Sequence, residues 1–134
     1  IFTTAYPQYA LEGFEVNDAV ERMLGQHMLW WQTVGLFVEH FANWELSWQG
    51  CIGDCVREQK SVHALRSAAA NVGAIALSRI AADLENQLLS CLAGQATSVP
   101  EYFRRNLKDS FRQTFQVAAE AWHSGSHAAG GRAC

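Results

Sequence analysis

Residues 61–85 constrain the fold more than any other stretch of this chain, because two helical patterns follow one another there with only a glycine-containing break between them. The first pattern places apolar residues at Val62, Leu65, Ala69 and Val72. The second places them at Leu77, Ile80, Ala81, Leu84 and Leu88. Apolar residues three and four positions apart share one face of a helix, and Gly73 suits the left-handed conformation in which helices commonly end. The pattern predicts an antiparallel helical hairpin.

The rest of the chain also has helical periodicity. A short helix is expected to end near Gly25, a long one to run from about residue 26 to 49, and a last one from about residue 98 to 122. The long helix carries an aromatic-rich stripe of Trp30, Val34, Phe37, Phe41, Trp44 and Trp48. The two prolines lie far apart and no segment alternates as a strand would. These features predict an all-α, up-and-down antiparallel four-helix bundle with a short extra N-terminal helix.

Composition divides the chain into three parts. Residues 1–12 are rich in aromatic side chains and contain a proline, which predicts an irregular N-terminal arm. Residues 13–123 would form the bundle. Residues 124–134 are rich in Gly, Ser and Ala, which predicts a disordered tail.

Charge and hydropathy argue against two classes of partner. The 134 residues carry a net charge of −3 and the only basic cluster is Arg104-Arg105, so nucleic acid is not an expected partner. The longest uncharged, apolar-leaning run, residues 23–38, is too short to span a membrane, and no signal peptide is recognised. The four cysteines lack the spacing of a metal site. We therefore expect a cytoplasmic domain that binds no metal and contacts no membrane.

His63 falls on the opposite side of its predicted helix from the apolar face, about 140° from the centre of that face. Its imidazole should therefore face solvent. Gln59, Arg66, Ser67 and Ala70 share its side, because they stand one or two helical turns away. This face carries one nucleophile, one permanent cation and little bulk.

The sequence around His63 resembles the signature of histidine-containing phosphotransfer (HPt) domains. That pattern reads H-x-L-K-G-S/A-S/A-x-x-x-G-A-x-x-L, with L-E one helix later. The similarity is carried by HALRSAA at 63–69, NVGA at 71–74, Leu77 and Leu84-Glu85. Gly53-Asp54 and the segment AVERMLGQHMLW at 19–30 also match family features, so that the similarity spans about residues 13–92 in one register without a gap.

This resemblance implies a phosphocarrier of a two-component phosphorelay. His63 would accept a phosphoryl group from an aspartate of a receiver domain and pass it to another receiver, while Arg66 stabilises the phosphoryl group. The chain would have no independent catalytic activity and no cofactor, since the magnesium ion belongs to the receiver. The expected partners are receiver domains and a hybrid sensor histidine kinase, and the chain itself would be a monomer. The expected docking residues are Val56, Gln59, Ser67 and Ala70.

Two positions depart from the family pattern. Arg66 stands where the family usually has lysine, and Ser67 where it usually has glycine. Arginine keeps the positive charge and can bind phosphoryl oxygens through two N–H groups, but it is bulkier than lysine. These replacements leave the rate of transfer and the choice of partner open.

Glu85 is the candidate partner of the His63 ring. It lies 22 residues after His63, across the predicted hairpin and about 80° from the centre line of the second apolar stripe. A carboxylate there can accept a hydrogen bond from Nδ1–H, which leaves Nε2 free and stabilises positive charge on the ring. The alternatives are a solvated surface glutamate at position 85 and an ordinary surface arginine at position 66.

Two other functions are compatible with the sequence. The bundle could dock a receiver or kinase without transferring anything, a reading that Arg66 and Ser67 favour. A dimetal bundle enzyme is the weakest alternative, because Glu120 and His123 form a single E-x-x-H motif and such a site needs two, with two further carboxylates.

Overall fold

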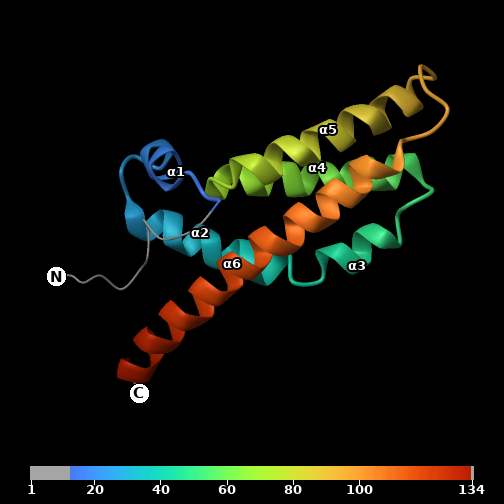
Figure 1. Ribbon diagram of the computed structural model, residues 1–134. Helices are drawn as coiled ribbons and strands as arrows, with labels where there is room; N and C mark the ends of the chain where they lie inside the picture. The colour runs from blue at the N-terminus through green and yellow to red at the C-terminus, as the bar shows by residue number, and fades with distance from the viewer. Residues whose placement is uncertain (1–12, 134) are drawn as a thin grey trace.

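The computed structural model describes residues 13–133, and every regular element in this range is a helix (Figure 1). The predicted N-terminal arm, residues 1–12, lies outside the described residues. The helices are α1 (Val16–Arg22), α2 (His27–His40), α3 (Trp44–Gln49), α4 (Cys55–Val72), α5 (Ile75–Leu92) and α6 (Glu101–Ala133). The all-α class predicted from the sequence is confirmed, and the helices pack against one another around a shared core.

Helices α4 and α5 form the predicted hairpin and lie side by side along their whole length (Figure 1). The Asp54 side chain caps the start of α4 by accepting a hydrogen bond from the Arg57 backbone N–H at 3.2 Å. Gly73 ends the helix in the left-handed conformation, with φ of 89°. The backbone N–H of Ala74 then donates to the Ala69 carbonyl at 2.8 Å, which closes the turn into α5.

The turn between α4 and α5 is anchored by two other helices. The Gly73 carbonyl accepts a hydrogen bond from the backbone N–H of Glu15, just before α1, at 2.6 Å. The indole N–H of Trp30, on α2, donates to the Val72 carbonyl at 2.9 Å, and Trp30 is fully buried. The end of α4 is thereby held from both sides.

The prediction of one long helix from about residue 26 to 49 is wrong, because this segment forms two separate helices, α2 and α3. Residues 41–43 form a turn, in which Phe41 and Asn43 have φ near −110° and ψ near 10°. The break turns α3 toward α4, where the indole N–H of Trp44 donates to the partly buried Ser61 carbonyl at 3.1 Å. The indole N–H of Trp48 donates to a carboxylate oxygen of the buried Glu58 at 3.0 Å. Helical periodicity continues across the turn, so the apolar stripe alone could not reveal it.

The last helix also differs from its prediction. The sequence predicted an end near Trp122 and a disordered tail at residues 124–134, whereas α6 continues to Ala133. A helix that is already nucleated extends at little cost, and the segment contains no proline to stop it.

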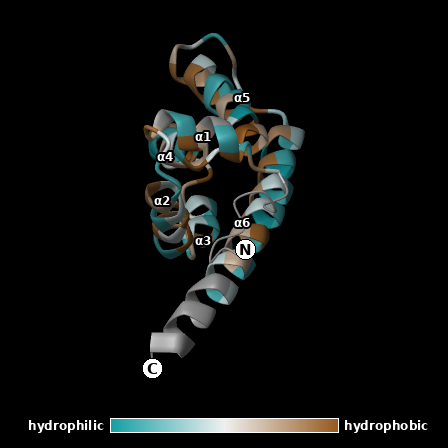
Figure 2. Cartoon of the chain, turned by 90° about the vertical axis from the view of Figure 1, so that its left-hand side faces the viewer, coloured by the Kyte–Doolittle hydropathy of each residue, from teal (hydrophilic) through white to brown (hydrophobic). Residues whose placement is uncertain are grey.

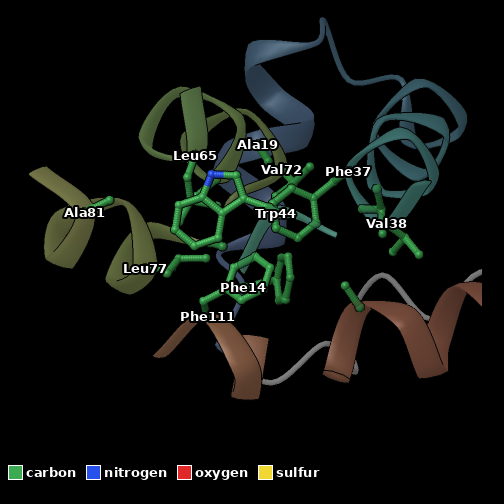
Figure 3. Packing of buried hydrophobic residues seen from close by; sticks show 14 of the residues in the cluster. Phe14, Ala19, Phe37, Val38, Trp44, Leu65, Val72, Leu77, Ala81 and Phe111 are labelled. Atoms are coloured by element: carbon green, nitrogen blue, oxygen red, sulfur yellow. The ribbon is translucent and has the colours of Figure 1, made fainter. Parts of the chain in front are cut away.

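The core draws on all the helices (Figure 3). Trp44 stacks on Trp48 and packs against Phe111 of α6, while Leu65 and Leu77 contribute from the hairpin. In Figure 2, α6 lies on one side of the molecule, α2 and α3 lie on the other, and α5 lies above them. Gly35 of α2 permits a close approach of α6, since a Cβ atom there would lie 2.5 Å from the Trp122 ring.

A buried ion pair joins three helices near the start of α4. Glu58 is fully buried and accepts two hydrogen bonds from Arg104 of α6, at 2.9 and 2.8 Å, besides the one from Trp48. The hydrogen bonds to Glu58 raise the pKa of the Arg104 guanidinium. Every donor around this carboxylate lies in the protein interior or at its edge, so the pair fixes α3 and α6 against α4.

Within residues 13–133, no helix is both long and apolar enough to cross a membrane.

The α4–α5 turn generates a stability prediction. Gly73→Ala should lower the free energy of unfolding by about 2–3 kcal/mol, because alanine is strained at positive φ and its Cβ would lie 2.8 Å from the Glu15 carbonyl oxygen. Gly94→Ala is the matched control, since Gly94 has φ of 78° but nothing within 4 Å of an added Cβ. Gly94→Ala should lower the free energy of unfolding only by the strain of placing alanine at positive φ, about 1 kcal/mol. Urea denaturation measures both, and equal losses would show that the contact with Glu15 is unimportant.

Candidate functional site

His63 projects from the exposed side of α4, as the helical pattern predicts. The apolar face of this helix, formed by Val62, Leu65, Ala69 and Val72, is completely buried. The His63 side chain, by contrast, is 56% exposed. The packing that buries one face of α4 therefore presents the imidazole to solvent.

Glu85 of α5 lies beside the His63 ring. The histidine Nδ1 is 2.9 Å from Glu85 Oε2. The alternative of a solvated surface glutamate is wrong, because Glu85 is only 3% exposed. A buried carboxylate needs hydrogen-bond donors around it, and the hairpin supplies them from α4.

Two more donors converge on the same carboxylate. Gln59 Nε2 donates to Glu85 Oε2 at 2.7 Å, and Arg66 Nη1 donates to Oε1 at 2.7 Å. Gln59, His63 and Arg66 stand one helical turn apart along α4, which explains how a single residue of α5 reaches all three. Glu85 thus has a partner on each oxygen, and the two flanking donors hold it in place beneath the imidazole.

The hydrogen bonds decide the ionisation of Glu85. Burial alone would raise the pKa of the carboxyl group, but the hydrogen bonds from Arg66, Gln59 and His63 outweigh it and hold the pKa below the ordinary value of 4.5. An ionised carboxylate can only accept hydrogen bonds, so the proton of a neutral His63 ring resides on Nδ1. Nε2 then carries the free lone pair.

A shallow hollow opens beside the imidazole. It is lined by His63, Arg66, Ser67, Ala70, Asn71 and Ser78. Ser78, at the start of α5, donates its hydroxyl to the Arg66 carbonyl at 3.1 Å, which ties the two helices together at the edge of the hollow. The walls are polar or small, so an anionic group could approach the ring from this side without meeting a bulky apolar side chain.

The predicted docking residues are not all equally available. Val56 and Ser67 are exposed, and Ala70 is half-buried in the wall of the hollow. Gln59 is also half-buried, and its amide is directed to Glu85. The sequence analysis placed Gln59 on the correct face but did not identify it as a donor to Glu85. Its position four residues before His63 was the available signal, because it faces the same segment of α5.

Arg66 also differs from the simplest expectation. Its guanidinium was expected to be available beside His63 for phosphoryl oxygens, and here it is paired with Glu85, although the side chain remains 45% exposed. The alternative of an ordinary surface arginine does not fit this ion pair with a buried carboxylate.

Among the described residues, no group of three or more His, Cys, Asp or Glu side chains could hold a metal ion. The hydrogen bonds to Glu85 bring together one imidazole, one buried carboxylate, one guanidinium and one amide. Such a set can present a nucleophilic nitrogen and stabilise positive charge on the ring behind it.

Comparisons with models of protein families, with curated proteins and with solved structures find no match for this chain.

The lowered pKa of Glu85 generates a pH prediction. A carboxyl group with a depressed folded-state pKa stabilises the fold above its unfolded-state value, and this contribution is lost as the pH falls through the folded-state value. Glu85→Gln should therefore lower the free energy of unfolding at pH 7 by about 1–2 kcal/mol. The expected loss is modest, because the Arg66 partner of the ionised Glu85 is partly exposed. The difference from the wild type should shrink as the pH falls below 4.5.

Urea denaturation at a series of pH values measures this difference. Glu39→Gln, at an exposed position on α2, is the control and should change stability little. A difference for Glu85→Gln that stays constant from pH 7 to pH 3 would mean that the charge of Glu85 does not contribute.

Proposed function

We propose that this chain is a histidine phosphotransfer protein or domain, which accepts a phosphoryl group on His63 from a receiver aspartate and passes it to another receiver. The observation that carries the proposal is the 2.9 Å contact between His63 Nδ1 and the buried Glu85 carboxylate. This contact leaves Nε2 as the nucleophile on an imidazole that is more than half exposed. The resemblance around residues 63–85 supports the same assignment.

The transfer needs no proton movement on this chain. The Nε2 lone pair attacks phosphorus, the P–O bond to the aspartate breaks, and the aspartate carboxylate leaves with the electron pair. The ring becomes a positively charged phosphoimidazole that still carries its proton on Nδ1. Glu85 stabilises this cation, because its negative charge lies 2.9 Å away in a buried position. In the reverse step, the P–N bond electrons return to Nε2.

The other site residues have assigned roles in the proposal. Arg66 stabilises the phosphoryl group, to which it would supply a permanent positive charge one helical turn from His63. Val56, Gln59, Ser67 and Ala70 surround the imidazole and would contact the receiver. The magnesium ion and the groups that activate the aspartyl phosphate would belong to that partner, so this chain would act as a phosphocarrier without independent catalytic activity.

The proposal also includes the finer topology, an up-and-down antiparallel four-helix bundle in which α2 with α3, α4, α5 and α6 are the four members and α1 is the extra helix. The short connection between α4 and α5 supports it, because a few residues can join only antiparallel neighbours. Receiver domains and a hybrid sensor histidine kinase would be the partners, which would place the chain in the cytoplasm as a monomer.

A second candidate function is a module that docks a receiver or kinase without transfer. The ion pair between Arg66 and Glu85 favours it, because a guanidinium held by a carboxylate is not free to bind phosphoryl oxygens. The serine at position 67, in place of a smaller glycine, favours it too.

Incubation with a phosphorylated receiver distinguishes the two functions. We expect acid-labile, alkali-stable label on the wild-type chain and none on His63→Gln, whose stability should be nearly unchanged because the side chain is largely exposed. His40→Gln is the matched control, an exposed histidine on α2, and should take label normally. Substantial label on His63→Gln would move the acceptor elsewhere, and a receiver that binds the wild-type chain without labelling it would favour the docking module.

The docking face generates a second prediction. Ser67→Arg should weaken receiver binding at least tenfold, because a long cationic side chain would block the approach to His63, and tenfold corresponds to about 1.4 kcal/mol. Ser47→Arg, at an exposed position on α3, adds the same side chain outside the proposed face. Titration calorimetry compares the two, and an equal affinity for both variants would place the interface on another surface.

A further inference from the structure

The pairing of Arg66 with Glu85 creates a question about the phosphorylated state. Arg66 Nη1 lies 2.7 Å from Glu85 Oε1, whereas His63 Nδ1 lies 2.9 Å from the other oxygen, Oε2. One buried carboxylate therefore holds both the imidazole and the guanidinium. A second anion, on Nε2 of the same imidazole, would compete with Glu85 for the guanidinium.

Arg66 is held less firmly than the other arginine that pairs with a buried carboxylate. Arg104 donates through both Nε and Nη2 to Glu58, and its side chain is only 16% exposed. The Arg66 pair is made by Nη1 alone, and the side chain is 45% exposed. The long exposed side chain can turn without disturbing the core, while Glu85 stays fixed by Gln59 and His63.

The charges around Glu85 change when His63 is phosphorylated. In the unphosphorylated site, Arg66 is the only permanently charged donor to Glu85. Phosphorylation converts the imidazole into a cation that faces Glu85, and it places a phosphoryl group of nearly two negative charges on the solvent side. Glu85 then has a second cationic partner, while a stronger anion stands one helical turn from Arg66.

We infer that Arg66 exchanges partners on phosphorylation: its guanidinium leaves Glu85 for the phosphoryl oxygens and returns when the phosphoryl group departs. The ion pair would keep the cation beside the reacting nitrogen and out of the way of the incoming receiver. The guanidinium suits such an exchange, because its planar set of N–H groups matches the geometry of both carboxylate and phosphoryl oxygens. The inference rests on the proposed function for its biological meaning, but the exchange itself requires only phosphate on His63.

The exchange can be observed by NMR of the arginine guanidinium groups in the full chain, with Glu85→Gln as the reporter variant. In the unphosphorylated chain, the Arg66 signals should shift when Glu85 is replaced. After phosphorylation they should move to new positions that Glu85→Gln changes far less. Arg57, an exposed arginine on the same helix, is the internal control and should not respond to either change.

Phosphorylation for this experiment can come from two donors. One is a phosphorylated receiver, and the other is phosphoramidate, from which Nε2 takes the phosphoryl group as the P–N bond of the donor breaks and ammonia leaves. The half-life of the phosphohistidine is measured in parallel. Arg66→Ala should shorten it about tenfold, the equivalent of about 1.4 kcal/mol, Arg66→Lys should restore most of it, and Arg57→Ala should leave it unchanged.

Each outcome bears on one proposal or both. Label from both donors, with Arg66 released from Glu85, supports the exchange and the proposed function together. Label from both donors, with Arg66 signals that still depend on Glu85 and a half-life unchanged in Arg66→Ala, overturns the exchange and leaves the function standing. Exchange seen with phosphoramidate, but no label from receivers, keeps the exchange as a property of the site and overturns the function. No label on His63 from either donor overturns both.

Discussion

The tight turn at Gly73 is the constraint on which both the fold and the candidate site depend. Its left-handed conformation reverses the chain between α4 and α5, and backbone hydrogen bonds from Glu15 and Ala74 hold it in one geometry. A turn of fixed length sets the register of the two helices. In that register His63 and Glu85, 22 residues apart in sequence, come within hydrogen-bond distance. A change in the turn would therefore disturb the core and the site together.

The two buried glutamates of this hairpin illustrate how the surroundings of a carboxylate decide its use. Each is almost inaccessible to solvent, and each is paired, as a buried charge must be. Glu58 is enclosed by Trp48 and the bidentate Arg104, which come from other helices, so its hydrogen bonds hold the bundle together. Glu85 instead receives its donors from one neighbouring helix, and two of those donors reach solvent. The His63 and Arg66 donors to Glu85 are thus accessible from solvent, whereas the Arg104 donor to Glu58 is largely enclosed.

The arginine at position 66 influences the electrostatics of the site. In a pocket that contains one carboxylate and one imidazole, an added cation lowers the pKa of the carboxyl group and favours the Nδ1-protonated ring. The same cation is half exposed and stands one helical turn from His63. The physical consequence is that Arg66 balances the negative charge of Glu85 within the site.

Local patterns in the sequence were sufficient to predict several features of the fold and the site. Helical periodicity predicted the α4–α5 hairpin and the exposure of His63, because a helix with one buried face leaves the opposite face to solvent. The contact between His63 and Glu85 could also be predicted, since a glycine-ended helix followed directly by another leaves little freedom of register. These features depend on residues close in sequence or joined by a short turn.

Other features were decided only by the tertiary structure. The break between α2 and α3 exists because Trp44 and Trp48 reach acceptors on α4, and the Glu58–Arg104 pair joins residues 46 positions apart. Arg66 and Gln59 both donate to Glu85, and this depends on how α5 is rotated against α4. The spacing of side chains along one helix gives no information about that rotation. Spacing along a helix tells which side chains share a face. Only the packed structure determines which of them find a common partner across the interface.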